Sequence, residues 1–244
     1  MIGLLALNVA SPSPEAARAL LEYLWHRDEQ VWVLSELTRG RGSRLVLDVC
    51  RAAGHRVAAT PPDQSGSAGR GVAVVVTDPD LEVNAAAPTG PRLVEVEVAG
   101  LRVLGVYGAA SDPVRYSDKA QRARKRAWLE DFVATVEQAT SRPGPLVVAG
   151  DLNIVDPDDV DGLRHVLPEE RAAYDRLTEM GLDDAYRAAH HGSRVTWVDH
   201  SGVGCRYDHV FTRDANVLAV DIDDSPRLAA HSDHSAIWAH LARD

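Results

Sequence analysis

A short apolar run near the middle of the chain ends in polar residues. The run covers residues 146–149, and Gly150-Asp151-Leu152-Asn153 follows it. This pattern predicts a buried strand that presents polar residues at its carboxyl end, where open sheets place their sites. If the extended geometry continues, the side chains of Asp151 and Asn153 leave the same face. The carboxylate can then accept a proton from a water, while the amide donates to a phosphate oxygen.

Other predicted strands also end on polar side chains. Asn8, Glu36 and Tyr107 come at the ends of apolar runs at 2–9, 31–35 and 101–106. Taken alone, an acid after a strand is most often solvated, and a tyrosine there most often packs half-buried in the core. Several such residues at one sheet edge would instead indicate a site.

Helices are predicted between these strands from capping residues and apolar spacing. Ser13-Pro14-Glu15 combines an N-cap, a proline at the first helical position and an acid in the first turn. A second helix is predicted over 45–53, and a third starts at Pro168 and stops at Gly181. A fourth runs through the basic segment 113–139.

Strands dominate two further parts of the chain. They are predicted at 56–60, 71–77, 81–86, 92–98, 101–106, 195–198, 207–212, 217–222 and 236–241. Ala99-Gly100 is predicted to be the turn of a hairpin because alternating apolar residues flank it. The order of elements gives two rounds of strand, helix and strand, which favours a mixed α/β fold.

Composition favours one domain over residues 1–244, since 45% of the residues are hydrophobic and no Gly/Ser-rich or Pro-rich linker divides the chain. The net charge of 26 − 36 = −10 argues against a uniformly basic nucleic-acid surface. The segment 113–139 is the one place where a phosphate backbone could be held, and the alternative is a solvated helix face. Its basic residues are Arg115, Lys119, Arg122, Arg124, Lys125 and Arg126.

Several features are expected to be structural or solvated. Cys50 and Cys205 are predicted to be reduced, buried thiols, with a disulfide as the alternative. The acidic stretch 156–161 lacks the glycine and glutamate of a calcium loop, which favours a solvated loop. The loop 61–71 is expected to be a mobile surface loop. We expect no signal peptide and no membrane span, and therefore a cytoplasmic protein, which we take to be a monomer.

The polar residues together resemble the endonuclease/exonuclease/phosphatase superfamily with its DNase-I-like fold. The matching set, in chain order, is Asn8, Glu36, Tyr107, Gly150-Asp151-Leu152-Asn153, Arg206-Tyr207-Asp208 and Ser232-Asp233-His234. The stretches GDLNIVDPDDVD and PEERAAYDRLTEMGLDDAYR look most like the exonuclease III branch of abasic-site endonucleases. The resemblance implies a four-layer α/β/β/α sandwich, with two mixed β-sheets face to face, helices outside and the site at one end.

The resemblance also implies a role for each matching residue. Glu36 would be the main ligand of Mg²⁺ or Mn²⁺, and Asp233 would bind this ion directly or through water. Asn8 would complete the hydrogen bonding around the metal and the attacking water. Asp151 would position or deprotonate that water.

The remaining matching residues would contact the phosphate or support those that do. Asn153 and Tyr107 would contact its oxygens, and His234 would donate to it. Asp208 would fix the tautomer of His234 and favour its charged form.

Three positions depart from the pattern of the abasic-site enzymes, namely Ala10, Ala110 and Cys205. We expect a metal-dependent phosphodiesterase that acts on nucleic acid, with DNA preferred to RNA and water as the nucleophile. One alternative is a hydrolase of a small phosphodiester or phosphomonoester. Another, motivated by Ala10 and Ala110, is a catalytically weakened nucleic-acid-binding module of the same fold.

Overall fold

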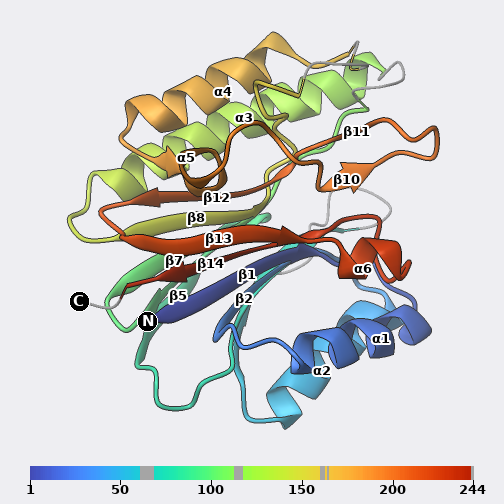
Figure 1. The fold of residues 1–244 in the computed structure, drawn as a ribbon, viewed down its shortest axis with the longest axis vertical. Helices are drawn as coiled ribbons and strands as arrows, with labels where there is room; N and C mark the ends of the chain where they lie inside the picture. Colours follow the sequence, from blue (N-terminus) through green and yellow to red (C-terminus); the bar gives the residue numbers. More distant parts are fainter. Residues whose placement is uncertain (61–68, 113–117, 160–162, 164, 243–244) are drawn as a thin grey trace.

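The computed structural model describes residues 1–60, 69–112, 118–159, 163 and 165–242, and its fold is built from two six-stranded sheets (Figure 1). The first sheet has the order β13 (Val217–Asp223), β14 (Ala236–Leu241), β1 (Ile2–Asn8), β2 (Val31–Leu37), β4 (Gly71–Val76) and β3 (Arg56–Ala59). The second has the order β5 (Val83–Gly90), β6 (Leu93–Val98), β7 (Leu101–Tyr107), β8 (Leu146–Asp151), β12 (Asp208–Arg213) and β9 (Asp183–Asp184). Both sheets are mixed, because β1 with β2 and β7 with β8 are parallel pairs.

Helices cover the outer face of each sheet. In Figure 1, α1 (Pro14–Trp25) and α2 (Arg41–Ala52) lie against the first sheet, and α3 (Lys119–Thr140) and α4 (Pro168–Glu179) against the second. Shorter elements complete the described part: α5 (Ala185–Ala189), α6 (Ser225–Leu228), and the pair of β10 (Trp197–Val198) with β11 (Gly204–Cys205). The four layers confirm the predicted sandwich with helices outside.

Three apolar clusters hold the layers together. One lies between the sheets and includes Val33, Val74 and Val103. Another packs α3 and α4 against the second sheet, and a third packs α1 and α2 against the first. Near-continuous burial along β1, β4 and β7 follows from this layering, because these strands are covered on both faces.

Most helix signals act as the sequence predicts. Ser13 caps α1, since its Oγ accepts a hydrogen bond from the Ala16 N–H at 3.2 Å. The predicted hairpin is also present: Val98 pairs with Leu101 across Ala99 and Gly100, which both have positive φ. Both cysteines are free and buried, as expected.

Three expectations from the sequence are wrong in part. Lys125 is not on a solvated face, because its side chain is fully buried and its Nζ lies 2.8 Å from Glu170 Oε1. Asp156 is also fully buried, so the acidic loop is not simply solvated. β5 runs to Gly90 and so lies further along the chain than the predicted strand at 81–86. It is an edge strand, and an edge strand tolerates a proline. Arg115 lies outside the described residues.

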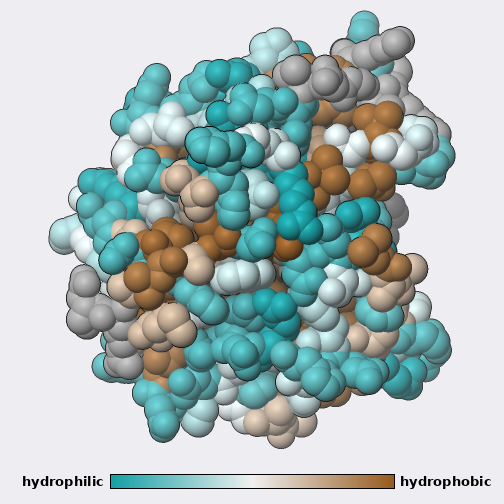
Figure 2. All heavy atoms as spheres, viewed as in Figure 1, coloured by the Kyte–Doolittle hydropathy of each residue, from teal (hydrophilic) through white to brown (hydrophobic). Residues whose placement is uncertain are grey.

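None of the described helices is long and apolar enough to cross a bilayer. Figure 2 shows that the face seen in Figure 1 is mainly hydrophilic, with small, separate hydrophobic areas.

Candidate active site

Strand register places three of the candidate residues on one rung of the second sheet. Asp151, the last residue of β8, pairs with Tyr107 at the end of parallel strand β7. On its other side it pairs with Asp208, the first residue of antiparallel strand β12. All three side chains are almost fully buried. The backbone hydrogen bonds of the sheet therefore fix the spacing of these residues.

Asn8 connects this rung to the first sheet. Its Nδ2 donates to Asp151 Oδ2 at 2.7 Å and to Glu36 Oε2 at 3.1 Å, and lies 3.3 Å from His234 Nε2. Its Oδ1 accepts from the Ala10 N–H at 2.8 Å, which fixes the orientation of the amide. Asn8 thus lies between the two carboxylates and the imidazole.

His234 and Asp208 form a buried pair across the two sheets. His234 Nδ1 lies 2.7 Å from Asp208 Oδ2, and Thr196 Oγ1 accepts from the Asp208 N–H at 3.1 Å. Burial opposes the charged imidazolium, but the charge and hydrogen bond of Asp208, together with the charge of Asp151, raise the pKa of His234 to about 10. At neutral pH the ring is therefore a cation whose Nε2 can donate.

The pKa of the Asp151 carboxyl group is also raised, which for an acid favours the neutral form. Burial raises its pKa to about 7, and the charge of Asp208 adds to this rise. His234 and the hydrogen bonds from Asn153 and Asn8 act against the rise. A carboxyl group with a pKa near neutrality is suited to accept a proton.

Asn153 reaches Asp151 by a route that the sequence did not predict. β8 ends at Asp151, and Asn153 has a φ of +50°, so the extended geometry does not continue. Asn153 folds back instead: its Nδ2 donates to Asp151 Oδ2 at 2.9 Å and its N–H to Asp151 Oδ1 at 2.9 Å. The expected reason for their proximity is wrong, although the side chains do meet.

Positive backbone φ values are concentrated at this site. Seven residues other than glycine have positive φ in the described part of the chain, and four of them, Ala10, Ser11, Glu36 and Asn153, lie here. Each such residue costs about 1–3 kcal/mol, which the surrounding structure must offset. At Glu36 the side chain accepts from Ser11 Oγ at 3.1 Å as well as from Asn8.

A cavity opens over these residues. It is lined by Glu36, Tyr107, Asp151, Asn153, Asp233 and His234, which the sequence singled out, and also by Arg70, Trp197 and Gln121. Asp233 is exposed, and its Oδ2 accepts from Trp197 Nε1 at 3.3 Å. Trp197 was missed because the sequence predicts only a strand at 195–198, with no sign that one of its side chains reaches the site. Arg70 was missed because it falls in the loop expected to be mobile.

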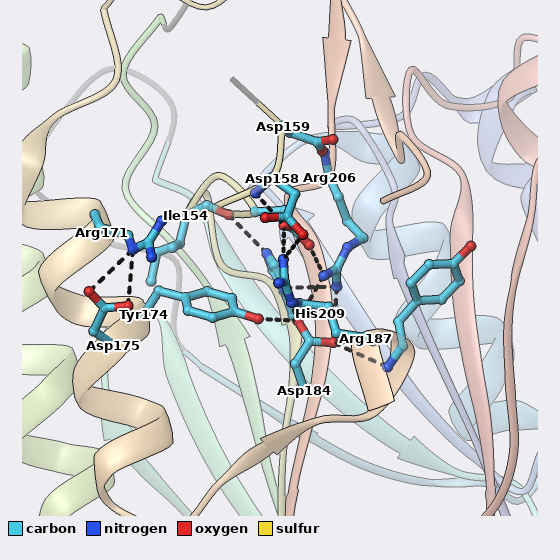
Figure 3. Close-up of polar contacts among 12 residues, drawn as sticks. Ile154, Asp158, Asp159, Arg171, Tyr174, Asp175, Asp184, Arg187, Arg206 and His209 are labelled. Atoms are coloured by element: carbon cyan, nitrogen blue, oxygen red, sulfur yellow. Dashed lines mark hydrogen bonds and ion pairs between the residues drawn. The ribbon is translucent and has the colours of Figure 1, made fainter. Parts of the chain in front are cut away.

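A separate buried network lies beside the site and supports it (Figure 3). Arg206 pairs with Asp184 through Nη2 to Oδ2 at 2.8 Å and also forms an ion pair with Asp156. His209 lies 3.0 Å from Arg206 Nη1 and 2.9 Å from the carbonyl oxygen of Ile154. The network therefore ties the start of β12 to the segment that follows Asn153.

The stacked mixed sheets, with polar residues gathered at one end of their strands, define a protein of the DNase-I-like fold class. A model of the endonuclease/exonuclease/phosphatase family matches residues 5–234, and the chain belongs to this family.

Individual relatives extend this result. Exodeoxyribonuclease III of Haemophilus influenzae is 28% identical over 143 residues, and the match covers 48% of this chain and 53% of that protein. The chain thus matches about half the length of this curated relative. A 3′-5′ exonuclease (NExo) from Neisseria meningitidis has a TM-score of 0.77 and 24% identity, covering 98% of this chain and 99% of that one. An AP endonuclease from Archaeoglobus fulgidus has a TM-score of 0.76 and 19% identity, covering 99% of both chains.

Proposed function

We propose that the protein is a divalent-metal-dependent hydrolase that cleaves phosphodiesters of DNA with water as the nucleophile. The observation that carries this proposal is that Asn8 joins Asp151, an acid with a raised pKa, to a buried His234–Asp208 pair. The names of relatives that are an exodeoxyribonuclease, a 3′-5′ exonuclease and an AP endonuclease support DNA as the substrate.

The protein's own residues divide the chemistry between two sides of the cavity. Asp151 accepts the proton of the attacking water, and Asn8 and Asn153 fix its carboxylate by donating to Oδ2. From the other side, the His234 imidazolium donates to the phosphate as negative charge develops on it, and Asp208 keeps the ring charged. The Tyr107 hydroxyl donates to another phosphate oxygen, because burial raises its pKa and keeps it protonated.

The donor set is suited to Mg²⁺ or Mn²⁺. Among the described residues no three His, Cys, Asp or Glu side chains converge as a dedicated metal cluster. Mg²⁺ is usually held by one or two carboxylates together with waters and substrate phosphates. Glu36 would be the main ligand, with Asn8 beside it and Asp233 at the rim. When bound, the ion would neutralise charge on the phosphate and lower the pKa of a bound water.

A second candidate substrate is a small phosphodiester or a phosphomonoester. The observation in its favour is that two basic residues of the basic segment are already paired with glutamates. Lys125 is buried against Glu170, and Arg126 Nε lies 2.6 Å from Glu169 Oε1. A short substrate would need fewer backbone contacts than a long duplex.

One substrate panel tests both candidates. The protein is incubated with Mg²⁺, Mn²⁺ or EDTA on abasic duplex, intact duplex, single-stranded DNA, RNA, a 3′-phosphorylated oligonucleotide and a chromogenic phosphodiester. We expect turnover of a DNA substrate that EDTA abolishes and that Glu36→Gln lowers about 100-fold or more. Glu179→Gln, which changes an exposed glutamate on α4, is the matched control. Absence of turnover on every substrate, or equal activity of Glu36→Gln and the parent, would refute the proposal.

A further inference from the structure

Arg70 precedes β4 and places its guanidinium in the cavity between the two sheets. Its Nη1 donates to the Tyr107 hydroxyl at 3.3 Å, and its Nη2 lies 3.4 Å from Glu36 Oε1. Its side chain is 40% exposed, whereas that of Glu36 is only 17% exposed. Arg70 thus contacts two residues to which the proposed mechanism already assigns roles.

Arg70 is a cation in a cavity lined by several carboxylates. The described lining includes the carboxylates of Glu36, Asp112, Asp151 and Asp233, and Arg70 is the only arginine or lysine within that lining. Burial opposes the charge of Arg70, but Tyr107, Glu36 and Asp233 raise its pKa, so the group stays charged. A phosphate that enters the cavity therefore meets the fixed charge of one guanidinium as well as the His234 imidazolium.

The contacts of Arg70 leave binding capacity unused. A guanidinium has five N–H donors in a planar fork that matches two oxygens of a phosphate or carboxylate. Here its Nη2 lies 3.4 Å from Glu36 Oε1, a distance longer than that of a strong charge-assisted hydrogen bond. Its Nε is buried and finds no acceptor in the part of the chain that the structure describes.

We propose that Arg70 is a phosphate-binding residue that exchanges partners during the reaction cycle. It neutralises Glu36 while the metal site is empty, and it binds a non-bridging oxygen of the substrate phosphate once a divalent cation takes Glu36. The inference rests on the proposed function, since it assigns a phosphate and a cation to the same cavity. It predicts that Arg70 has opposite effects on the two ligands.

Cation binding provides the first test, and it needs no turnover. Mn²⁺ is titrated into the full chain, without DNA, by calorimetry. Because Arg70 competes for Glu36, Arg70→Gln should bind Mn²⁺ about twofold to fivefold more tightly than the parent, as expected for loss of a partly exposed ion pair. Arg92→Gln is the matched control. Arg92 lies over the Tyr107 ring at 4.7 Å and donates to the Gly108 carbonyl, so we expect its loss to leave Mn²⁺ affinity unchanged.

Phosphate binding provides the second test, measured in EDTA by fluorescence anisotropy of a labelled 3′-phosphorylated oligonucleotide. The background is Glu36→Gln, in which Arg70 has lost its carboxylate partner. Adding Arg70→Gln to this background should weaken binding about tenfold to a hundredfold, as for loss of a hydrogen bond between charged groups. Arg70→Lys should recover part of this loss, because it keeps the charge without the fork.

The direction in which Arg70→Gln changes Mn²⁺ affinity and oligonucleotide affinity tests the inference. If Arg70→Gln weakens the binding of both Mn²⁺ and the oligonucleotide, Arg70 has only a structural role and the inference is overturned. Unchanged oligonucleotide affinity in the Glu36→Gln background would also overturn it. If both binding effects appear while the parent hydrolyses no substrate, the proposed function fails and the assignment of Arg70 stands.

Discussion

Two buried polar clusters lie next to each other in this protein, and their charges are balanced in different ways. Around Arg206, each buried acid has a cationic partner. Burial alone would raise the pKa of Asp184, but His209 and Arg206 lower it well below its usual range. At the candidate active site, burial instead raises the pKa of Asp151 to about 7. A paired cluster stabilises the fold, whereas an incompletely compensated one retains the capacity to take up a proton or a cation.

The same short segment supplies both clusters. Asp208 and His209 are neighbours on β12, and alternation along a strand sends their side chains to opposite faces. Asp208 therefore meets His234 in the site, while His209 joins Arg206 in the network. Changes in the first cluster should mainly affect catalysis, and changes in the second should mainly affect stability.

The largest effect should follow from Asp151→Asn. We expect kcat to fall about 10³–10⁴-fold, because the variant cannot accept the proton of the attacking water. The free energy of unfolding at pH 8 should change by less than about 2 kcal/mol, since weaker hydrogen bonds are offset by removal of a buried carboxylate. Steady-state kinetics and urea unfolding measure the two quantities. A kcat within tenfold of the parent would contradict the proton-accepting role.

Arg206→Met should show the reverse pattern. It leaves the buried carboxylates of Asp156 and Asp184 without their main cation, so we expect a loss of about 3–5 kcal/mol in the free energy of unfolding. Arg171→Met is the control, because Arg171 and Asp175 form an exposed pair worth less than about 1 kcal/mol. Equal losses in both variants would remove the distinction between the network and an ordinary surface pair.

Acid pH should act through the network. The pKa of Asp184 is lowered in the folded state, so its stabilising contribution is complete above the unfolded pKa of about 4. That contribution is lost as the pH falls from about 4 towards the lower folded pKa, with a total on the order of 2 kcal/mol. Unfolding measured between pH 5 and pH 2 should therefore depend less on pH in Asp184→Asn than in the parent. The same slope in both proteins would show that other acids control acid unfolding.

The smallest effect should come from Tyr174→Phe. The Tyr174 hydroxyl donates to Asp184 Oδ2 at 2.9 Å, and its loss should reduce the free energy of unfolding by about 1 kcal/mol. We expect kcat to be unchanged, because Tyr174 contacts the network and not the cavity. A fall in kcat larger than about threefold would mean that the two clusters are coupled more closely than their contacts imply.

Sequence reasoning identified residues at strand ends and missed those placed by tertiary contacts. Tyr107 and Asp151 were found because an apolar run followed by a polar residue predicts a strand end, whereas Asp208 was found only through the family resemblance. The path of Asn153 was not predictable, since one residue in the left-handed region reverses the chain without a glycine to mark it.

Charge runs were the weakest guide. Asp156 and Lys125 stand in segments rich in charge, which usually indicate solvated surface. Their burial depends on Arg206 and Glu170, which lie about 50 and 45 positions further along the chain. No local pattern reveals such partners. Arg70 was missed for a related reason, because a Gly-rich loop carries no periodicity that says which way its side chains face.

Asn8, His234 and Arg70 all come from the first sheet or its flanking loops, and each contacts a residue of the second sheet. Their partners are Asp151 at 2.7 Å, Asp208 at 2.7 Å and Tyr107 at 3.3 Å. The site is therefore shared between the two halves of the sandwich, much as some dimers share a site between subunits. The second sheet comes from one continuous stretch, 83–213, whereas the first takes strands from both ends of the chain. A fragment holding only the second sheet would lack Asn8, His234 and Arg70, so activity could return only when the rest of the chain reassembles with it.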